Sequence, residues 1–154
     1  FGLVKRSSSE NESGQEIVAD TALIQMLQDS FSPSGCLFSY RNVATGETDF
    51  AGVQKLLFMY WGAVRRTFPE AWGKPPTQSR LMHSVGIRAM GKLMDRLMSS
   101  VDVSNPESMA WVQDELRPLR SVCRWTSGSW EDINQMPWNG LQNNPAHMRV
   151  LTNF

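Results

Sequence analysis

The stretch FAGVQKLLFMYWGAVRRTF, residues 50–68, decides the fold of this chain. Its apolar residues recur at the three- and four-residue spacing that places them on one face of an α-helix for about five turns. Thr48 or Asp49 can cap the start, and Pro69 removes a backbone N–H and disfavours the α region for Phe68. The stretch therefore predicts a long amphipathic helix that ends at Phe68. Its apolar face comprises Phe50, Val53, Leu56, Leu57, Tyr60, Trp61, Val64 and Phe68.

A second long helix is predicted after the break at residues 73–76, GKPP. It starts with Thr77 or Ser79 as its cap and runs to about Met98. Gly86 and Gly91 lie inside it, and each costs roughly 1 kcal/mol relative to alanine. Because a helix usually keeps such a glycine where a neighbouring backbone approaches closely, we expect helix 50–68 to cross there. The apolar stripe comprises Met82, Val85, Gly86, Ala89, Met90, Leu93, Met94 and Leu97.

Shorter helices are predicted on both sides of this pair. Residues 15–30 show helical spacing that SPSG, residues 32–35, interrupts. Residues 104–107, SNPE, form a capping box in which the Ser104 hydroxyl accepts from the Glu107 N–H, and the helix that follows bends or ends near Arg117. A last helix begins at Pro145, capped by Asn144.

The remaining segments are loops. Residues 36–47 mix apolar residues with a turn-prone Thr-Gly pair and are compatible with a short β-hairpin. Residues 125–144 predict an ordered loop region pinned by Trp125, Trp130 and Trp138. The sequence thus predicts a mainly α fold, a helical domain with long ordered loops and at most one short β-hairpin.

The chain has the length of one domain, with 154 residues. Residues 7–14 are polar and small, which is typical of a loop or linker, so we expect a flexible linker over residues 1–14 and a single helical domain over residues 15–154. The chain begins at Phe1 rather than Met and stops at Phe154 inside a helix that has just started. We therefore expect it to be a piece of a larger protein.

Several classes of protein are excluded by composition. No apolar run approaches the roughly 18 to 20 residues of a membrane span, and no signal sequence opens the chain. Cys36 and Cys123 have neither framework spacing nor metal-ligand spacing, and together with two dispersed histidines they do not predict a zinc site. We expect a cytoplasmic protein without a bound metal or cofactor.

Catalytic residues are sparse. His83 and His147 can act as bases only if the fold brings a nucleophile close, and a lone histidine is more often structural. Gly86 and Gly91 lie within a helical pattern rather than in a phosphate loop. The adjacent carboxylates at 114–115 and 131–132 point in different directions. This fragment therefore contains no catalytic constellation, and its status as an enzyme stays open.

The basic residues are more informative. The formal net charge is zero, yet residues 51–96 hold eight basic and two acidic groups. Arg88, Lys92 and Arg96 recur every four residues, so they share a helix face. Such a row can follow a phosphate backbone, or it can simply keep the helix soluble with Asp95 as partial compensation. The candidate nucleic-acid-binding residues are Arg65, Arg66, Arg80, Arg88, Lys92 and Arg96.

The loop tryptophans allow two interpretations. Trp125, Trp130 and Trp138 could stack on bases, but that mode needs interleaved cations, and the nearest are Arg120 and Arg124. We therefore favour a role in anchoring the core and loops.

Three segments resemble a known family. FPEAW at 68–72 and SRLMHSVGIRAMGKLMD at 79–95 are similar to the later part of DGQHR-domain proteins, among them the DndB-type regulators of DNA phosphorothioation. Arg124-Trp125, Trp130 and WNGLQ at 138–142 resemble the end of that family. The Asp-Gly-Gln-His-Arg motif itself is absent, so no catalytic residue carries over. The resemblance implies a helical C-terminal portion, with the motif-bearing N-terminal half of the parent protein as its partner.

The expected function follows from this resemblance and from the basic row. We expect an accessory or DNA-facing domain of a DGQHR-type protein involved in DNA modification, its regulation or defence, with DNA bound through phosphate contacts. The alternative is a structural or dimerisation module with no direct nucleic-acid contact. The partners to be tested include a second copy of the chain, in a homo-oligomer. A hydrolase fragment that lacks its partner residues is a third interpretation.

Overall fold

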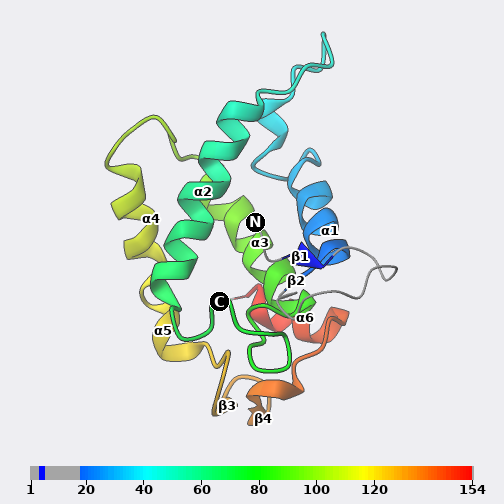
Figure 1. Cartoon of the computed structure of the whole chain (residues 1–154), viewed down its shortest axis with the longest axis vertical. Helices are drawn as coiled ribbons and strands as arrows, with labels where there is room; N and C mark the ends of the chain where they lie inside the picture. Colours follow the sequence, from blue (N-terminus) through cyan, green and yellow to red (C-terminus); the bar gives the residue numbers. More distant parts are fainter. Residues whose placement is uncertain (1–3, 6–17, 154) are drawn as a thin grey trace.

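The computed structural model describes residues 4–5 and 18–153, and the described part is mainly α-helical, as predicted (Figure 1). The α-helices are α1 (Asp20–Ser30), α2 (Phe50–Thr67), α3 (Ser84–Met98), α4 (Ser108–Leu116), α5 (Leu119–Val122) and α6 (Pro145–Leu151). Two 3₁₀ helices are η1 (Phe38–Tyr40) and η2 (Trp138–Gly140). The strands are β1 (Val4–Lys5), parallel to β2 (Val18–Ala19), and β3 (Ser129–Trp130), antiparallel to β4 (Met136–Pro137).

The predicted N-terminal segments are described only in part. Most of the expected linker at 1–14 lies outside the described residues, but Val4–Lys5 within it pairs with β2. The first helix starts at Asp20, five residues later than expected, because Val18–Ala19 is extended and pairs with that strand.

Helix α2 confirms the prediction from residues 50–68. The Asp49 carboxylate accepts from the Gly52 N–H at 3.0 Å, which caps the first turn. The helix ends at Thr67, and the Phe68 N–H closes the last turn on the Val64 carbonyl at 2.9 Å, directly before Pro69. Local sequence signals thus determined both ends of α2.

Helix α3 starts later than predicted. Its cap is His83, whose Nδ1 accepts from the Val85 N–H at 3.3 Å, so the expected caps Thr77 and Ser79 were wrong. The Ser79 N–H is taken by the Pro75 carbonyl at 3.0 Å, and the Arg80 N–H by the distant Trp125 carbonyl at 2.8 Å. Because these bonds fix a turn at residues 75–80, the helix can begin only after it.

The predicted capping box before α4 was also wrong. Asp102 Oδ1 accepts from both the N–H and the hydroxyl of Ser104, at 2.9 and 2.6 Å. The Glu107 N–H donates instead to Asn105 Oδ1 at 2.9 Å, and α4 begins at Ser108. The carboxylate of Asp102 therefore outcompetes the helix for the Ser104 side chain. The cap of α6 is as predicted, since Asn144 Oδ1 accepts from the His147 N–H at 2.9 Å.

Helix α3 is packed between the other helices. Helix α1 lies along α3, and α4 lies along α2, as the blue and yellow helices at the two sides of Figure 1 show. Helices α2 and α3 meet through a large side chain, because the buried Tyr60 hydroxyl donates to the Met90 carbonyl at 2.6 Å. Trp61 is buried, as predicted.

The two α3 glycines do not face α2, which corrects the expected crossing. A Cβ at Gly91 would lie 2.3 Å from Cγ of Met26, so Gly91 is where α1 approaches. A Cβ at Gly86 would lie 2.1 Å from the Arg80 carbonyl oxygen, so Gly86 makes room for the turn before its own helix. Close approach does explain both glycines, but α1 and a loop are the neighbours.

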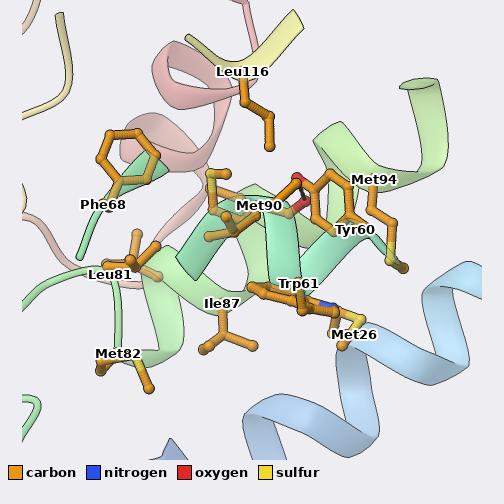
Figure 2. Close-up of a cluster of buried hydrophobic side chains, with 14 of the residues drawn as sticks. Met26, Tyr60, Trp61, Phe68, Leu81, Met82, Ile87, Met90, Met94 and Leu116 are labelled. Carbon is orange, nitrogen blue, oxygen red and sulfur yellow. Dashed lines mark hydrogen bonds between the residues drawn. The ribbon is translucent and has the colours of Figure 1, made fainter. Parts of the chain in front are cut away.

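The core lies where α1, α2, α3 and α4 converge. Figure 2 shows Met26, Tyr60, Met90, Met94 and Leu116 pointing into one cluster from these helices. All five side chains are buried. Methionines let this core follow irregular helix surfaces, because the unbranched thioether side chain adapts its shape.

The short hairpin expected at residues 36–47 is reduced to a single antiparallel bridge, and an antiparallel pair of strands lies elsewhere. Residues 36–47 contain η1 and a turn closed by one antiparallel bridge between Arg41 and Thr48, while the antiparallel pair of strands is β3–β4. Asn134 and Gln135, with φ of 50° and 56°, lie in the turn between those strands.

In residues 4–5 and 18–153, no helix combines the length and the apolarity needed to cross a membrane.

Candidate nucleic-acid interface

The predicted basic row lies on one side of α3. Arg88, Lys92 and Arg96 occupy successive turns, and Lys92 and Arg96 are exposed. The Arg88 side chain is only 23% exposed, so it is not a solvated residue. Arg80 precedes the helix, at the end of the turn at residues 75–80.

The arginines near this row bind the C-terminal segment of the chain. Arg80 Nε donates to the Asn139 carbonyl at 3.0 Å, and Arg88 Nη1 donates to Asn143 Oδ1 at 3.1 Å. Arg96 Nη1 donates to the Thr152 carbonyl. Three basic residues thus hold residues 139–152 against α3, a role that their helical spacing alone does not reveal.

The acceptors matter for the charge of this surface. Asn139 and Thr152 offer neutral carbonyl oxygens, which orient a guanidinium group without cancelling its charge. Arg88 Nη2 also lies 3.7 Å from Asp29 Oδ2. Among the described residues, this is the one ion pair that a residue of the basic row makes. The Asp95 carboxylate, expected to compensate the row, accepts from the Cys36 N–H at 3.1 Å instead.

Arg65 and Arg66 lie apart from the row, in the last turn of α2 near α5. Both side chains are exposed, and neither makes a hydrogen bond or ion pair with the described residues. Beyond them, Arg120 of α5 donates to the Thr67 carbonyl and lies 3.8 Å from Glu70 Oε2. The structure therefore divides the six predicted residues into an α3 group and an α2-end pair.

A further basic residue joins the α3 side. Arg149 of α6 is exposed and lies one turn before Thr152, whose carbonyl binds Arg96. The sequence placed Arg149 on a helix, but only the contact between α6 and α3 brings it to this surface.

The tryptophans anchor the core rather than forming a stacking platform. Trp125 and Trp130 are buried, with ring centroids 5.1 Å apart in an edge-to-face arrangement, and Trp125 also meets Phe68 at 6.1 Å. Buried rings of this kind cannot stack on a base. Trp138 is partly buried in η2.

The histidines and cysteines serve structural purposes. Burial, followed by the nearby Arg80 charge, lowers the pKa of His83, which keeps Nδ1 free to accept its capping bond. His147 Nδ1 accepts from the Gln142 N–H at 2.9 Å. Burial raises the pKa of Cys123 to about 12 and that of Cys36 further, so neither thiol is a ready nucleophile near neutral pH.

No cluster of three or more potential metal ligands occurs among residues 4–5 and 18–153. Comparisons of the chain with protein-family models, with curated proteins and with solved structures find no match. The similarity to DGQHR-domain proteins therefore stays a prediction, based on the residues quoted for it.

Proposed function

We propose that this chain is the helical accessory domain of a DGQHR-type protein and that it binds a nucleic-acid backbone through the α3–α6 surface. Lys92, Arg96 and Arg149 provide the exposed charge of this surface. Participation in DNA modification, its regulation or defence follows from the family resemblance and belongs to the same proposal. So does a location in the cytoplasm, which fits the dispersed cysteines.

One observation carries the proposal: Arg96 donates to a neutral carbonyl oxygen, and no carboxylate of the described residues lies within ion-pair distance of Lys92, Arg96 or Arg149. A guanidinium group has five N–H donors, and Arg96 uses one of them on Thr152. The rest of the group remains available to a phosphate, and its orientation is already fixed. Compensation by carboxylates would have argued for a merely solvated helix face.

The contacts expected from such a surface position a duplex or single strand without reading its sequence. Binding should therefore be sequence-tolerant and should weaken steeply with rising salt, because the release of counterions from the nucleic acid on binding then becomes less favourable. Arg65 and Arg66, at the end of α2, can extend the path of the backbone.

Fluorescence anisotropy with a labelled duplex and a labelled single strand at low salt tests the proposal. Lys92→Glu should weaken binding about equally on unrelated sequences and flatten the salt slope by roughly one unit per lost phosphate contact. Lys55→Glu is the matched control, since Lys55 is exposed on α2 and the change in net charge is identical. Lys55→Glu should change binding much less than Lys92→Glu.

Equal losses in the two variants would show that only net charge matters and would reject this surface. If the unmodified chain binds neither probe at low salt, direct contact with nucleic acid is rejected. The structural or dimerisation role then becomes the better explanation, and sedimentation measurements of the same samples would show whether the chain self-associates.

A further inference from the structure

A second surface, away from the basic row, is apolar. Ile24 of α1 and Phe50 at the start of α2 are 53% and 73% exposed. They line one open groove together with the partly buried Leu27, Phe31 and Phe38. Large apolar side chains gathered around one groove mark an interaction site more often than scattered ones do.

The groove has the dimensions of a short helical segment. One wall consists of Ile24, Leu27 and Gln28 of α1 with the adjacent Phe31, which share one helix face. These residues span about 10 Å along α1, or roughly two turns. The opposite wall is the 38–50 connection that leads to the top of α2 in Figure 1.

The described residues that line the groove include one charged residue, and it is basic. Arg41 is the charged residue among those that line it, and it is exposed. Its side chain makes no hydrogen bond or ion pair within residues 4–5 and 18–153. A guanidinium without a partner among these residues, next to apolar side chains, is complementary to a carboxylate on an otherwise apolar partner.

The area of the surface selects among possible occupants. Phe50 leaves roughly 150 Å² of side chain in water, and the whole patch amounts to a few hundred Å². A stable dimer buries about 800 Å² on each partner. The groove is therefore too small to hold a second folded copy by itself, but it suits one face of a short amphipathic helix.

We propose that this groove binds a short amphipathic helix from a protein partner. Two apolar side chains of that helix, one turn apart, pack between Ile24 and Phe50, and an aspartate or glutamate of the same helix pairs with Arg41. This is the helix-in-groove mode of peptide recognition. The inference uses no residue of the α3–α6 surface, so it is independent of the proposed nucleic-acid binding.

The test is a selection of 14-residue peptides from a displayed library against the full chain. The Ile24→Ser/Phe50→Ser double variant serves for counter-selection. Enriched peptides should carry apolar residues at helical spacing together with an acidic residue. Their affinity, measured by anisotropy, should fall at least about tenfold for the double variant and stay unchanged for Val43→Ser, an exposed apolar position outside the groove.

The charge contact has its own measurement. Arg41→Glu should weaken an enriched peptide by about tenfold and should favour a copy of the peptide whose acidic residue is replaced by lysine. Circular dichroism melting should show that the variants at 24, 41 and 50 remain folded, since these side chains are exposed. Lys92→Glu should leave peptide binding unchanged, so this proposal and the nucleic-acid proposal fail separately.

Three results would overturn the inference. One is the recovery of no peptide that distinguishes the chain from the double variant. Another is enrichment of basic peptides, or an Arg41→Glu variant with unchanged preference. The third is dimerisation of the unmodified chain that the double variant abolishes, which would assign the groove to a second copy instead.

Discussion

Replacing Gly91 by alanine tests the packing of α1 on α3. The new Cβ would lie 2.3 Å from Cγ of Met26, whose side chain is 3% exposed and has little room to move. Overpacking of this kind typically costs about 1 to 3 kcal/mol. The better helix propensity of alanine returns about 1 kcal/mol. We therefore expect Gly91→Ala to lower the free energy of unfolding by up to about 2 kcal/mol.

Gly62→Ala provides the matched control inside α2. The nearest atom to a Cβ there is Cε of Met109 at 3.9 Å, which is an ordinary contact. Only the propensity term then remains, so Gly62→Ala should stabilise the protein by up to about 1 kcal/mol. Urea denaturation followed by circular dichroism measures both variants.

A double-mutant cycle identifies the neighbour. Met26→Ala alone should cost about 2 to 5 kcal/mol, as for other buried methionines. In combination with Gly91→Ala it should cost less than the sum, with a coupling of about 1 kcal/mol or more, because removal of the thioether makes room for the new methyl group. If Gly91→Ala stabilises the protein as much as Gly62→Ala, α1 does not approach α3 at this glycine.

Two further predictions concern His83 and Arg88. The pKa of His83 is lowered in the folded chain, so near and below the ordinary value of 6.5 the unfolded chain binds more protons than the folded chain. The contribution of neutral His83 to stability is therefore complete above about pH 6.5 and is lost as pH falls toward the lowered pKa. Urea titrations between pH 5 and 8 should show this loss, and His83→Asn, which keeps a capping oxygen but does not titrate, should reduce it. Arg88→Ala should destabilise the protein by about 1 to 2 kcal/mol, because it removes the hydrogen bond to Asn143. Lys92→Ala should change stability by no more than about half a kcal/mol. Equal melting temperatures for the two variants would contradict a stabilising role of the Arg88–Asn143 hydrogen bond.

The candidate site was only partly predictable. Four-residue spacing correctly placed Arg88, Lys92 and Arg96 on one side of a helix. The partners of the arginines, Asn143 and Thr152, lie 55 and 56 residues further along the chain. No periodicity reports on pairs so distant in sequence, and for this reason the sequence predicted a solvent-facing row where the structure shows a row that binds the C-terminal segment.

The sequence by itself determined the helices whose signals are local. The apolar spacing of residues 50–68, the Asp49 cap and Pro69 act within one or two turns, so α2 needed no tertiary information. The same is true of the Asn144 cap of α6. The tertiary structure decided where α3 begins, since the Trp125 carbonyl takes the Arg80 N–H, and which helix approaches Gly91. Long-range hydrogen bonds and close packing outweigh local propensities, which differ by less than about 1 kcal/mol per residue apart from proline.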